Sequence, residues 1–281
     1  MQVFLDGDFV DSTKASVSVF DRSFLYGDGL FETIRVHRGK PFCLARHLER
    51  LEHGAADLGI ALPSPRAELA SFALRLIETN AIPESLLRIT LSRGVGERGY
   101  SPVGANRPTL VMTTHPLAAS NGSPPQWRLI TSTIRLPARD LVSGHKTNNK
   151  LRQILARAEA TKAGADEALL LNTNGHMAEG SACNFFWVHG GTIRTAPQAA
   201  GILRGITREI VFELCDKLKF RRVETAAPPE SLKAVDGAFA TLSSLGIVEV
   251  FALDDTPIPS SGLVSQLQQA YRELLQAECS G

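Results

Sequence analysis

Short runs of alternating hydrophobic and polar residues occur over much of the chain and predict β-strands joined by tight turns. QVFLDGDFV (2–10) holds two such runs around Asp6-Gly7, and ETIRVHRGKPFCL (32–44) holds two more around Arg38-Gly39. Pairs that end in glycine between alternating runs are typical of β-hairpin turns. The chain is therefore predicted to begin with antiparallel strands.

A different spacing predicts helices after these hairpins. Over residues 44–58, apolar side chains recur at three- and four-residue steps, which places them on one helix face, and residues 66–79 repeat the pattern. LLRITLSRG (86–94) and PTLVMTTHPL (108–117) then return to strand-like alternation. The N-terminal part is thus predicted to be a sheet covered by two helices.

A polar, Pro/Gly/Ser-rich stretch at residues 117–125 separates this part from a second set of elements. Strands are predicted at 127–136 and 239–259, with hairpins turning at Asn174-Gly175 and Gly190-Gly191, and helices at 149–162, 206–219 and 263–279. We predict a mixed α and β protein. Its expected domains span residues 1–116 and 126–281, joined by a linker at 117–125.

Charge and cysteine content narrow the classes of partner. The 30 Lys and Arg balance 29 Asp and Glu to a net charge of +1. A chain with so little net charge has little electrostatic attraction for nucleic acid or for a membrane surface. No apolar stretch of about 18 residues occurs, and no signal peptide is visible at the start. The four cysteines lack metal-ligand spacing. We therefore expect a cytoplasmic protein without a metal site.

Two residues could carry covalent or proton-transfer chemistry. Lys146 stands at a predicted strand-to-helix junction, where it is either a solvated charge or a Schiff-base nucleophile. Glu179 lies between apolar segments, and a carboxylate in such surroundings needs a partner. An arginine would serve, and so would a pyridinium nitrogen, which the carboxylate would keep protonated.

Further residues could bind an anion. Gly205, Ile206 and Thr207 open a predicted helix, whose first N–H groups and positive dipole end attract phosphate. Ser243 and Ser244 add hydroxyls at a turn, and Arg50 could add a charge. Each also has an ordinary explanation as a helix cap, a turn or a surface arginine. Taken together, an amine, a carboxylate, a helix-start anion site and an arginine are what pyridoxal phosphate requires.

In this order and context, the motifs resemble the fold-type IV pyridoxal-phosphate enzymes, the class IV aminotransferase family. The resemblance covers nearly the whole chain and is carried by YGDGLFETIR, HLERL, RGVGERGYSP, HKTNN, MAEGSACNFFWV, GILRGITR and FATLSSLGIVEV. It implies a smaller N-terminal α/β sandwich domain and a larger, barrel-like C-terminal α/β domain, with pyridoxal 5'-phosphate between them. It also implies a homodimer that acts on a small-molecule substrate.

The resemblance implies a role for each matching residue. Lys146 would form a Schiff base with the cofactor and move the proton at the substrate carbon, and Glu179 would pair with the pyridine nitrogen. The phosphate would be bound by Arg50, Gly205, Ile206, Thr207, Ser243 and Ser244. The substrate would be contacted by Phe31, Thr33, Arg98 and Tyr100.

The segment RGVGERGYS (93–101) resembles the substrate loop of 4-amino-4-deoxychorismate lyases. This implies β-elimination of pyruvate to give 4-aminobenzoate for folate synthesis, with Arg98 holding a carboxylate of the dianionic substrate. Leu242 departs from the Asn common in these lyases, and Glu32 is as typical of transaminases. A D-amino-acid or branched-chain amino-acid aminotransferase is therefore the alternative.

Overall fold

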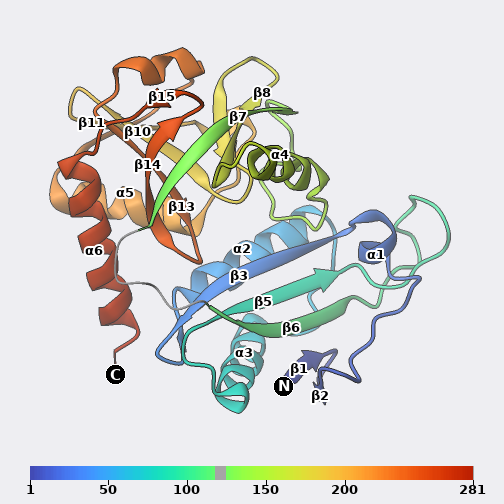
Figure 1. Ribbon diagram of the computed structural model, residues 1–281. Helices are drawn as coiled ribbons and strands as arrows, with labels where there is room; N and C mark the ends of the chain where they lie inside the picture. The colour runs from blue at the N-terminus through green and yellow to red at the C-terminus, as the bar shows by residue number, and fades with distance from the viewer. Residues whose placement is uncertain (118–124, 281) are drawn as a thin grey trace. The chain divides into compact units, whose positions relative to one another are not determined.

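The computed structural model describes residues 1–117 and 125–280, which form two compact units (Figure 1). The first unit holds the described residues up to 117 together with 146–149 and 275–280. The second holds 125–145 and 150–274. Most of the linker predicted at 117–125 lies outside the described residues, and the division into domains at 1–116 and 126–281 stays a prediction.

The first unit contains an antiparallel six-stranded sheet among its described residues, in the order β2-β1-β6-β5-β3-β4. Asp6 and Arg38 adopt positive φ angles of 47° and 51° and are each followed by a glycine, as the two predicted hairpin turns require. The strands are β1 (Gln2–Leu5), β2 (Asp8–Asp11), β3 (Gly29–His37), β4 (Lys40–Pro41), β5 (Ser85–Ser92) and β6 (Thr109–Pro116).

Helices α2 (Leu44–Asp57) and α3 (Arg66–Asn80) pack against one face of this sheet (Figure 1). Alternate residues of β3, including Leu30 and Ile34, join Leu51 of α2 and Leu69 of α3 in an apolar core. The intervening residues of β3 and β5 form the other face. A short helix, α1 (Arg22–Tyr26), precedes β3, with Asp21 as its N-cap. Five residues are too few to show a helical period, so the sequence pattern does not predict α1.

The second unit is built on a barrel-like sheet, in agreement with the predicted fold class. Its described strands run in the order β10-β13-β14-β7-β8-β9, and β9 pairs back to β10 through Glu179 and Asn184, which closes the ring. The ring strands are β7 (Gln126–Leu136), β8 (Glu167–Asn172), β9 (Met177–Gly180), β10 (Asn184–His189), β13 (Gly237–Leu242) and β14 (Gly246–Leu253). Shorter strands extend it, namely β11 (Thr192–Thr195), β12 (Arg221–Glu224) and β15 (Thr256–Pro257).

Helices α4 (Leu151–Lys162) and α5 (Ile206–Leu218) pack against strands of this sheet. The chain ends in α6 (Gly262–Glu278), and two 3-10 turns, η1 (Gln198–Ala200) and η2 (Pro229–Ala234), complete the elements. α4 begins at Leu151 rather than at residue 149 as predicted; Lys150 is its N-cap, and Thr147 and Asn148 before it pair with β3. Across the described residues, no helix is long and apolar enough to cross a membrane.

Candidate active site

Lys146 lies in a short segment that backbone hydrogen bonds fix against β3. The Phe31 N–H donates to the Lys146 carbonyl at 2.8 Å, Thr147 pairs with Leu30, and the Asn148 N–H donates to Gly29 at 2.9 Å. The Lys146 Nζ lies 4.5 Å from the centroid of the Phe31 ring, within the range of a cation–π contact. The side chain of Lys146 is thus aimed at the sheet face that carries Phe31.

Arg88 on β5 shares this face. Its Cζ lies 4.0 Å from the same Phe31 centroid, and its Nε donates to Thr90 at 3.2 Å. Thr33 is the cross-strand partner of Arg88, so the structure brings two predicted substrate residues, Phe31 and Thr33, together with Lys146 and Arg88. Arg88 is half-buried, and this desolvation lowers the pKa of its guanidinium below its usual value.

Sequence reasoning missed Arg88. The signal was present, because a charged residue at an outward position of an otherwise apolar strand, LLRITLS, is unusual on a face that is partly buried. What could not be read from the sequence is the register of β5 against β3, which sets Arg88 opposite Thr33.

Arg50 is held by Glu32 on the opposite, core-facing side of β3. The Arg50 Nε and Nη2 donate to the two carboxylate oxygens of Glu32 at 2.8 and 2.6 Å, and His47 Nδ1 lies 2.7 Å from the same carboxylate. Because a carboxylate only accepts, Nδ1 must carry the proton. Burial alone would raise the pKa of Glu32, but the Arg50 charge and the His47 hydrogen bond lower it to about 2. Glu32 therefore carries a negative charge that orients Arg50.

Glu179 is nearly buried at the seam that closes the barrel-like sheet. Its Oε2 accepts hydrogen bonds from the Leu203 N–H at 2.9 Å and from the Asn184 side-chain amide at 3.3 Å. Asn184 also donates to the Leu203 carbonyl at 2.9 Å, so it joins the carboxylate to the segment that leads into α5. The sequence analysis includes Asn184 only within the motif MAEGSACNFFWV and assigns it no role, because its partner Leu203 is distant along the chain.

The start of α5 has the features of an anion site. Its N-cap is Gly205, which makes no side-chain capping hydrogen bond, so the first-turn amides of Ile206 and Thr207 are not satisfied by a cap. A methyl group built on Gly205 would overlap the Asn184 Oδ1, so a larger residue there would displace the helix start or the Asn184 side chain. In the same unit, the buried Thr241 Oγ1 has no hydrogen-bond partner among the described residues.

The remaining predicted residues lie on turns and loops. Ser243 and Ser244 occupy the turn between β13 and β14, three positions or fewer from Thr241, and both are half-buried. Arg98 and Tyr100 stand on an exposed loop of the first unit, between β5 and β6, with Tyr100 87% exposed. The structure does not describe a contact between these two side chains and Lys146.

Each unit, taken by itself, carries groups that fit a part of pyridoxal 5'-phosphate. An amine beside an aromatic ring is present in the first unit, and the second offers a carboxylate oriented by two N–H donors. The uncapped helix start with its close-packed glycine, and the unpartnered Thr241 hydroxyl among the described residues, suit a phosphate. No group of three or more His, Cys, Asp or Glu in the described ranges could hold a metal ion.

Burial raises the thiol pKa values of cysteines in this chain, Cys183 and Cys215 among them. All four cysteines are buried and free of disulfide bonds. Burial raises the pKa of Cys183 well above its usual value, and the neighbouring Glu167 and Glu179 raise it further. Burial also raises the pKa of Cys215 to about 11. Thiols with raised pKa values stay protonated at neutral pH and are poor nucleophiles.

The chain is similar to known proteins over nearly its whole length. The model of the amino-transferase class IV family matches residues 29–253. A putative branched-chain-amino-acid aminotransferase of Methanocaldococcus jannaschii is 34% identical over 98% of this chain and 96% of its own length. The structure of 4-amino-4-deoxychorismate lyase from Pseudomonas aeruginosa is similar with a TM-score of 0.86 and 31% identity, over 96% of this chain and 98% of that one. The structure of the branched-chain aminotransferase from Thermoproteus uzoniensis with norvaline gives a TM-score of 0.91 and 28% identity, over 99% and 96%.

Proposed function

Because the chain belongs to the class IV aminotransferase family, we propose that it catalyses β-elimination of pyruvate from 4-amino-4-deoxychorismate. The family consists of pyridoxal-phosphate enzymes, so the sequence predictions of the family, of an enzyme and of this cofactor are confirmed. The proposal concerns the specific reaction, the substrate and the residues that carry them out.

The observation that carries this proposal is the presence of two differently placed arginines in the first unit. Arg88 is half-buried, beside Phe31 and Lys146, and Arg98 is exposed on the loop RGVGERGYS. A guanidinium binds a carboxylate through two parallel N–H donors, and the proposed substrate carries two carboxylates. A monocarboxylate amino acid with an aliphatic side chain would leave one of these cations without a partner from the substrate.

We assign the other residues as follows. Lys146 would hold the cofactor and then remove the proton from the amine-bearing carbon, since the Phe31 ring beside Nζ confines the amine to one side of the sheet. Glu179, held by Leu203 and Asn184, would pair with the protonated ring nitrogen. When bound, the cofactor supplies an electron sink for the charge that develops at that carbon. The phosphate would be bound by Arg50, Gly205, Ile206, Thr207, Ser243 and Ser244.

An aminotransferase is the second candidate, and two observations favour it. The M. jannaschii relative at 34% identity is named a putative branched-chain-amino-acid aminotransferase, and the segment Phe31-Glu32-Thr33 on β3 resembles transaminases as much as lyases. Both reactions begin with removal of the same proton by Lys146. They differ in whether a leaving group departs or a proton returns, which depends on how side chains position the substrate.

A product assay separates the two candidates. Purified, cofactor-saturated protein is incubated with freshly generated 4-amino-4-deoxychorismate, and 4-aminobenzoate and pyruvate are followed together. Equal release of both products by the wild type, lost in Lys146→Ala but kept in Lys162→Ala, supports the lyase. Without any release, a change of the cofactor spectrum on addition of D- or L-amino acids would move the assignment to an aminotransferase.

We also propose that the enzyme is a homodimer. The segment before β3 exposes Val19, Phe20 and Phe24 by 61%, 65% and 73%, and contiguous apolar side chains of this size are typical of an interface. The occupant we propose is a second copy of this chain, as the family resemblance implies. The cytoplasmic location and the role in folate synthesis stay predictions.

A further inference from the structure

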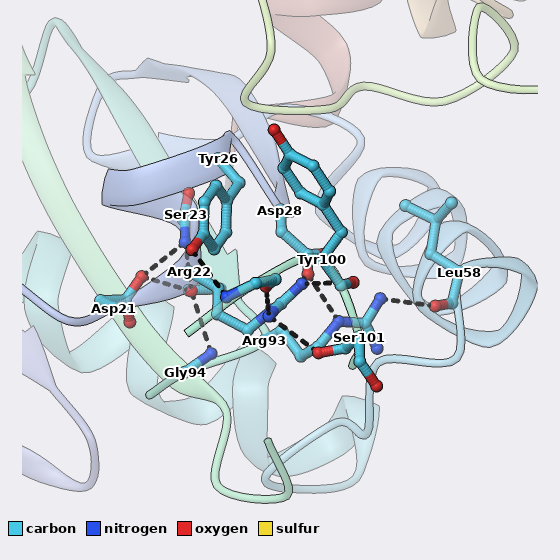
Figure 2. Close-up of polar contacts among 12 residues, drawn as sticks. Asp21, Arg22, Ser23, Tyr26, Asp28, Leu58, Arg93, Gly94, Tyr100 and Ser101 are labelled. Atoms are coloured by element: carbon cyan, nitrogen blue, oxygen red, sulfur yellow. Dashed lines mark hydrogen bonds and ion pairs between the residues drawn. The ribbon is translucent and has the colours of Figure 1, made fainter. Parts of the chain in front are cut away.

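Arg22 is a buried guanidinium whose donors converge on one loop. Its side chain is 4% exposed. Its Nη1 donates to the carbonyls of Gly99 and Ser101, each at 3.0 Å, and its Nη2 donates to the Tyr100 carbonyl at 3.1 Å (Figure 2). The remaining donor, Nε, lies 2.8 Å from Asp28 Oδ2. Three successive backbone carbonyls are therefore turned inward onto a single cation.

The loop has further contacts with the same short helix. The Gly99 N–H donates to the Tyr26 hydroxyl at 3.2 Å, and the Tyr26 and Tyr100 rings meet edge-on at 5.6 Å. Tyr26 follows Arg22 by one helical turn, so both side chains leave the same face of α1. At the loop's first turn, Gly94 has a φ of 90°, and a methyl group there would overlap the Arg107 carbonyl. The backbone is thus fixed while the side chains of Arg98 and Tyr100 stay exposed.

Asp28 supplies the countercharge that lets Arg22 be buried. Burial tends to raise the pKa of Asp28, but hydrogen bonds from Arg93 and Arg22 hold it below its usual 3.8. Arg93 Nε also lies 2.8 Å from Asp28 Oδ2, and its other donors reach the Gly59 and Leu58 carbonyls at 2.7 and 2.8 Å (Figure 2). Arg22 and Arg93 therefore share one carboxylate but hold different segments, which makes each the natural control for the other.

We propose that Arg22 is a positioning residue for substrate recognition. It fixes the backbone of Gly99–Ser101 so that Arg98 and Tyr100 are already in place for a substrate carboxylate remote from the reacting carbon. This inference rests on the proposed function, in which Arg98 binds such a carboxylate. A loop ordered before binding loses less conformational entropy when the substrate arrives, so its contribution appears in substrate affinity rather than in turnover.

The first test measures the loop itself and needs no substrate. Arg98 provides a trypsin site at the Arg98–Gly99 bond, which directly precedes the three carbonyls that Arg22 holds. We expect the holoenzyme to be cut there slowly and Arg22→Gln to be cut on the order of ten times faster, because proteolysis follows the population of the open loop. Arg93→Gln should be cut there at the wild-type rate. Equal cleavage of Arg22→Gln and the wild type would overturn the proposal.

The second test measures recognition with whichever substrate the product assay identifies. Arg22→Gln should raise KM on the order of tenfold with kcat within about twofold of the wild type, whereas Arg93→Gln should leave KM unchanged. Arg22→Lys keeps the charge but not the fork of donors, so it should give an intermediate KM, and it replaces Arg22→Gln if that variant fails to fold.

The two tests distinguish the inference from the function on which it rests. Faster cleavage of Arg22→Gln with an unchanged KM would overturn the role in recognition, even where the product assay confirms the lyase. Faster cleavage with a raised KM for an aminotransferase substrate would uphold the positioning role and reject the proposed reaction. A lower kcat with unchanged KM would also overturn the proposal, since it would place the effect on turnover.

Discussion

Glu32 shows how the partners of a single buried side chain set its charge and the stability that follows from it. The carboxylate is 1% exposed, and its contacts with Arg50 and His47 outweigh the effect of burial, so its pKa is about 2 instead of 4.5. A carboxyl whose pKa is lower in the folded state stabilises the fold above its unfolded pKa, and this contribution disappears as the pH falls through the folded pKa.

We therefore expect Glu32→Gln to lower the free energy of unfolding at pH 7 by on the order of 3 kcal/mol. The difference from the wild type should shrink as the pH is lowered from about 4.5 towards 2, the window between the unfolded and folded pKa values. Urea denaturation of both proteins at pH 7 and at pH 3 measures this. An equal loss at both pH values would mean that packing, rather than the charge of Glu32, stabilises this region.

Arg98 is exposed on its loop, so its removal should leave the fold unchanged. In Arg98→Ala, we expect KM for a dicarboxylate substrate to rise on the order of a hundredfold, because a charge-assisted bidentate pair is lost. Retention of the cofactor, followed by its absorbance after gel filtration, should match the wild type. Arg107→Ala, an exposed arginine of the same segment, is the control. An unchanged KM in Arg98→Ala would remove Arg98 from substrate binding.

The site residues that the sequence predicts are those that belong to recognisable local motifs. Lys146 at a junction and Glu179 between apolar segments were predicted as site residues only together with the other motifs, because each alone also has an ordinary explanation. Arg22, Arg88 and Asn184 did not stand out, because each acts on a partner that only the fold brings near, such as the Tyr100 carbonyl for Arg22. Single-residue chemistry is visible in a sequence, whereas strand register is not.

Among the elements, the long helices followed their apolar spacing closely. The prediction for residues 206–219 corresponds to α5 at Ile206–Leu218, and the prediction for 66–79 to α3 at Arg66–Asn80. Elements that tertiary contacts define were missed, namely the five-residue α1 and strand β12, all of whose residues are exposed and which pairs in parallel with β11. Periodicity needs several turns or residues to appear, so short elements escape it.

The start of α5 gives a prediction for a whole element rather than for one functional group. In Gly205→Ala, the added methyl group would overlap the Asn184 Oδ1, so either the helix start or the Asn184 side chain must move. Both movements disturb the first-turn amides that we assign to the phosphate. We expect weaker retention of the cofactor, on the order of tenfold in its dissociation constant, with little change in helix content.

Gly262 provides the matched control, because it also stands at the start of a helix, α6, and a methyl group there would meet nothing within 4 Å. Equilibrium dialysis against pyridoxal 5'-phosphate gives the dissociation constants, and circular dichroism gives the helix content. If Gly262→Ala loses as much cofactor affinity as Gly205→Ala, the loss would follow from any Gly→Ala change at a helix start and not from a phosphate site at α5. Wild-type affinity in Gly205→Ala would argue against a phosphate site at α5.

At the scale of each unit, the closure of a sheet and the placement of chemistry coincide. The pairing of β9 with β10 that closes the barrel-like sheet is made by Glu179 and Asn184, and the same two side chains hydrogen-bond to each other and to Leu203. In the first unit, β3 divides its functions between faces, with Glu32 towards the helices and Phe31 towards Lys146. In each unit, backbone pairing therefore positions the candidate residues, and substitution of a single side chain would not remove this pairing.

The assembly of the whole molecule gives the last prediction. Phe24 is 73% exposed on α1, and burying an aromatic ring of this size against a second chain would stabilise a dimer by about 2 kcal/mol. A carboxylate at the same position would instead have to be desolvated without a partner. We therefore expect the wild type to have twice the 30.4 kDa mass of one chain in size-exclusion chromatography with light scattering, and the mass of Phe24→Asp to shift towards that of one chain.

The control is Leu74→Asp, which changes a 49% exposed apolar residue on α3 and should leave the mass unchanged. A wild type that has the mass of a single chain at micromolar concentration, or a Phe24→Asp variant that stays dimeric while Leu74→Asp dissociates, would place the interface elsewhere or exclude it.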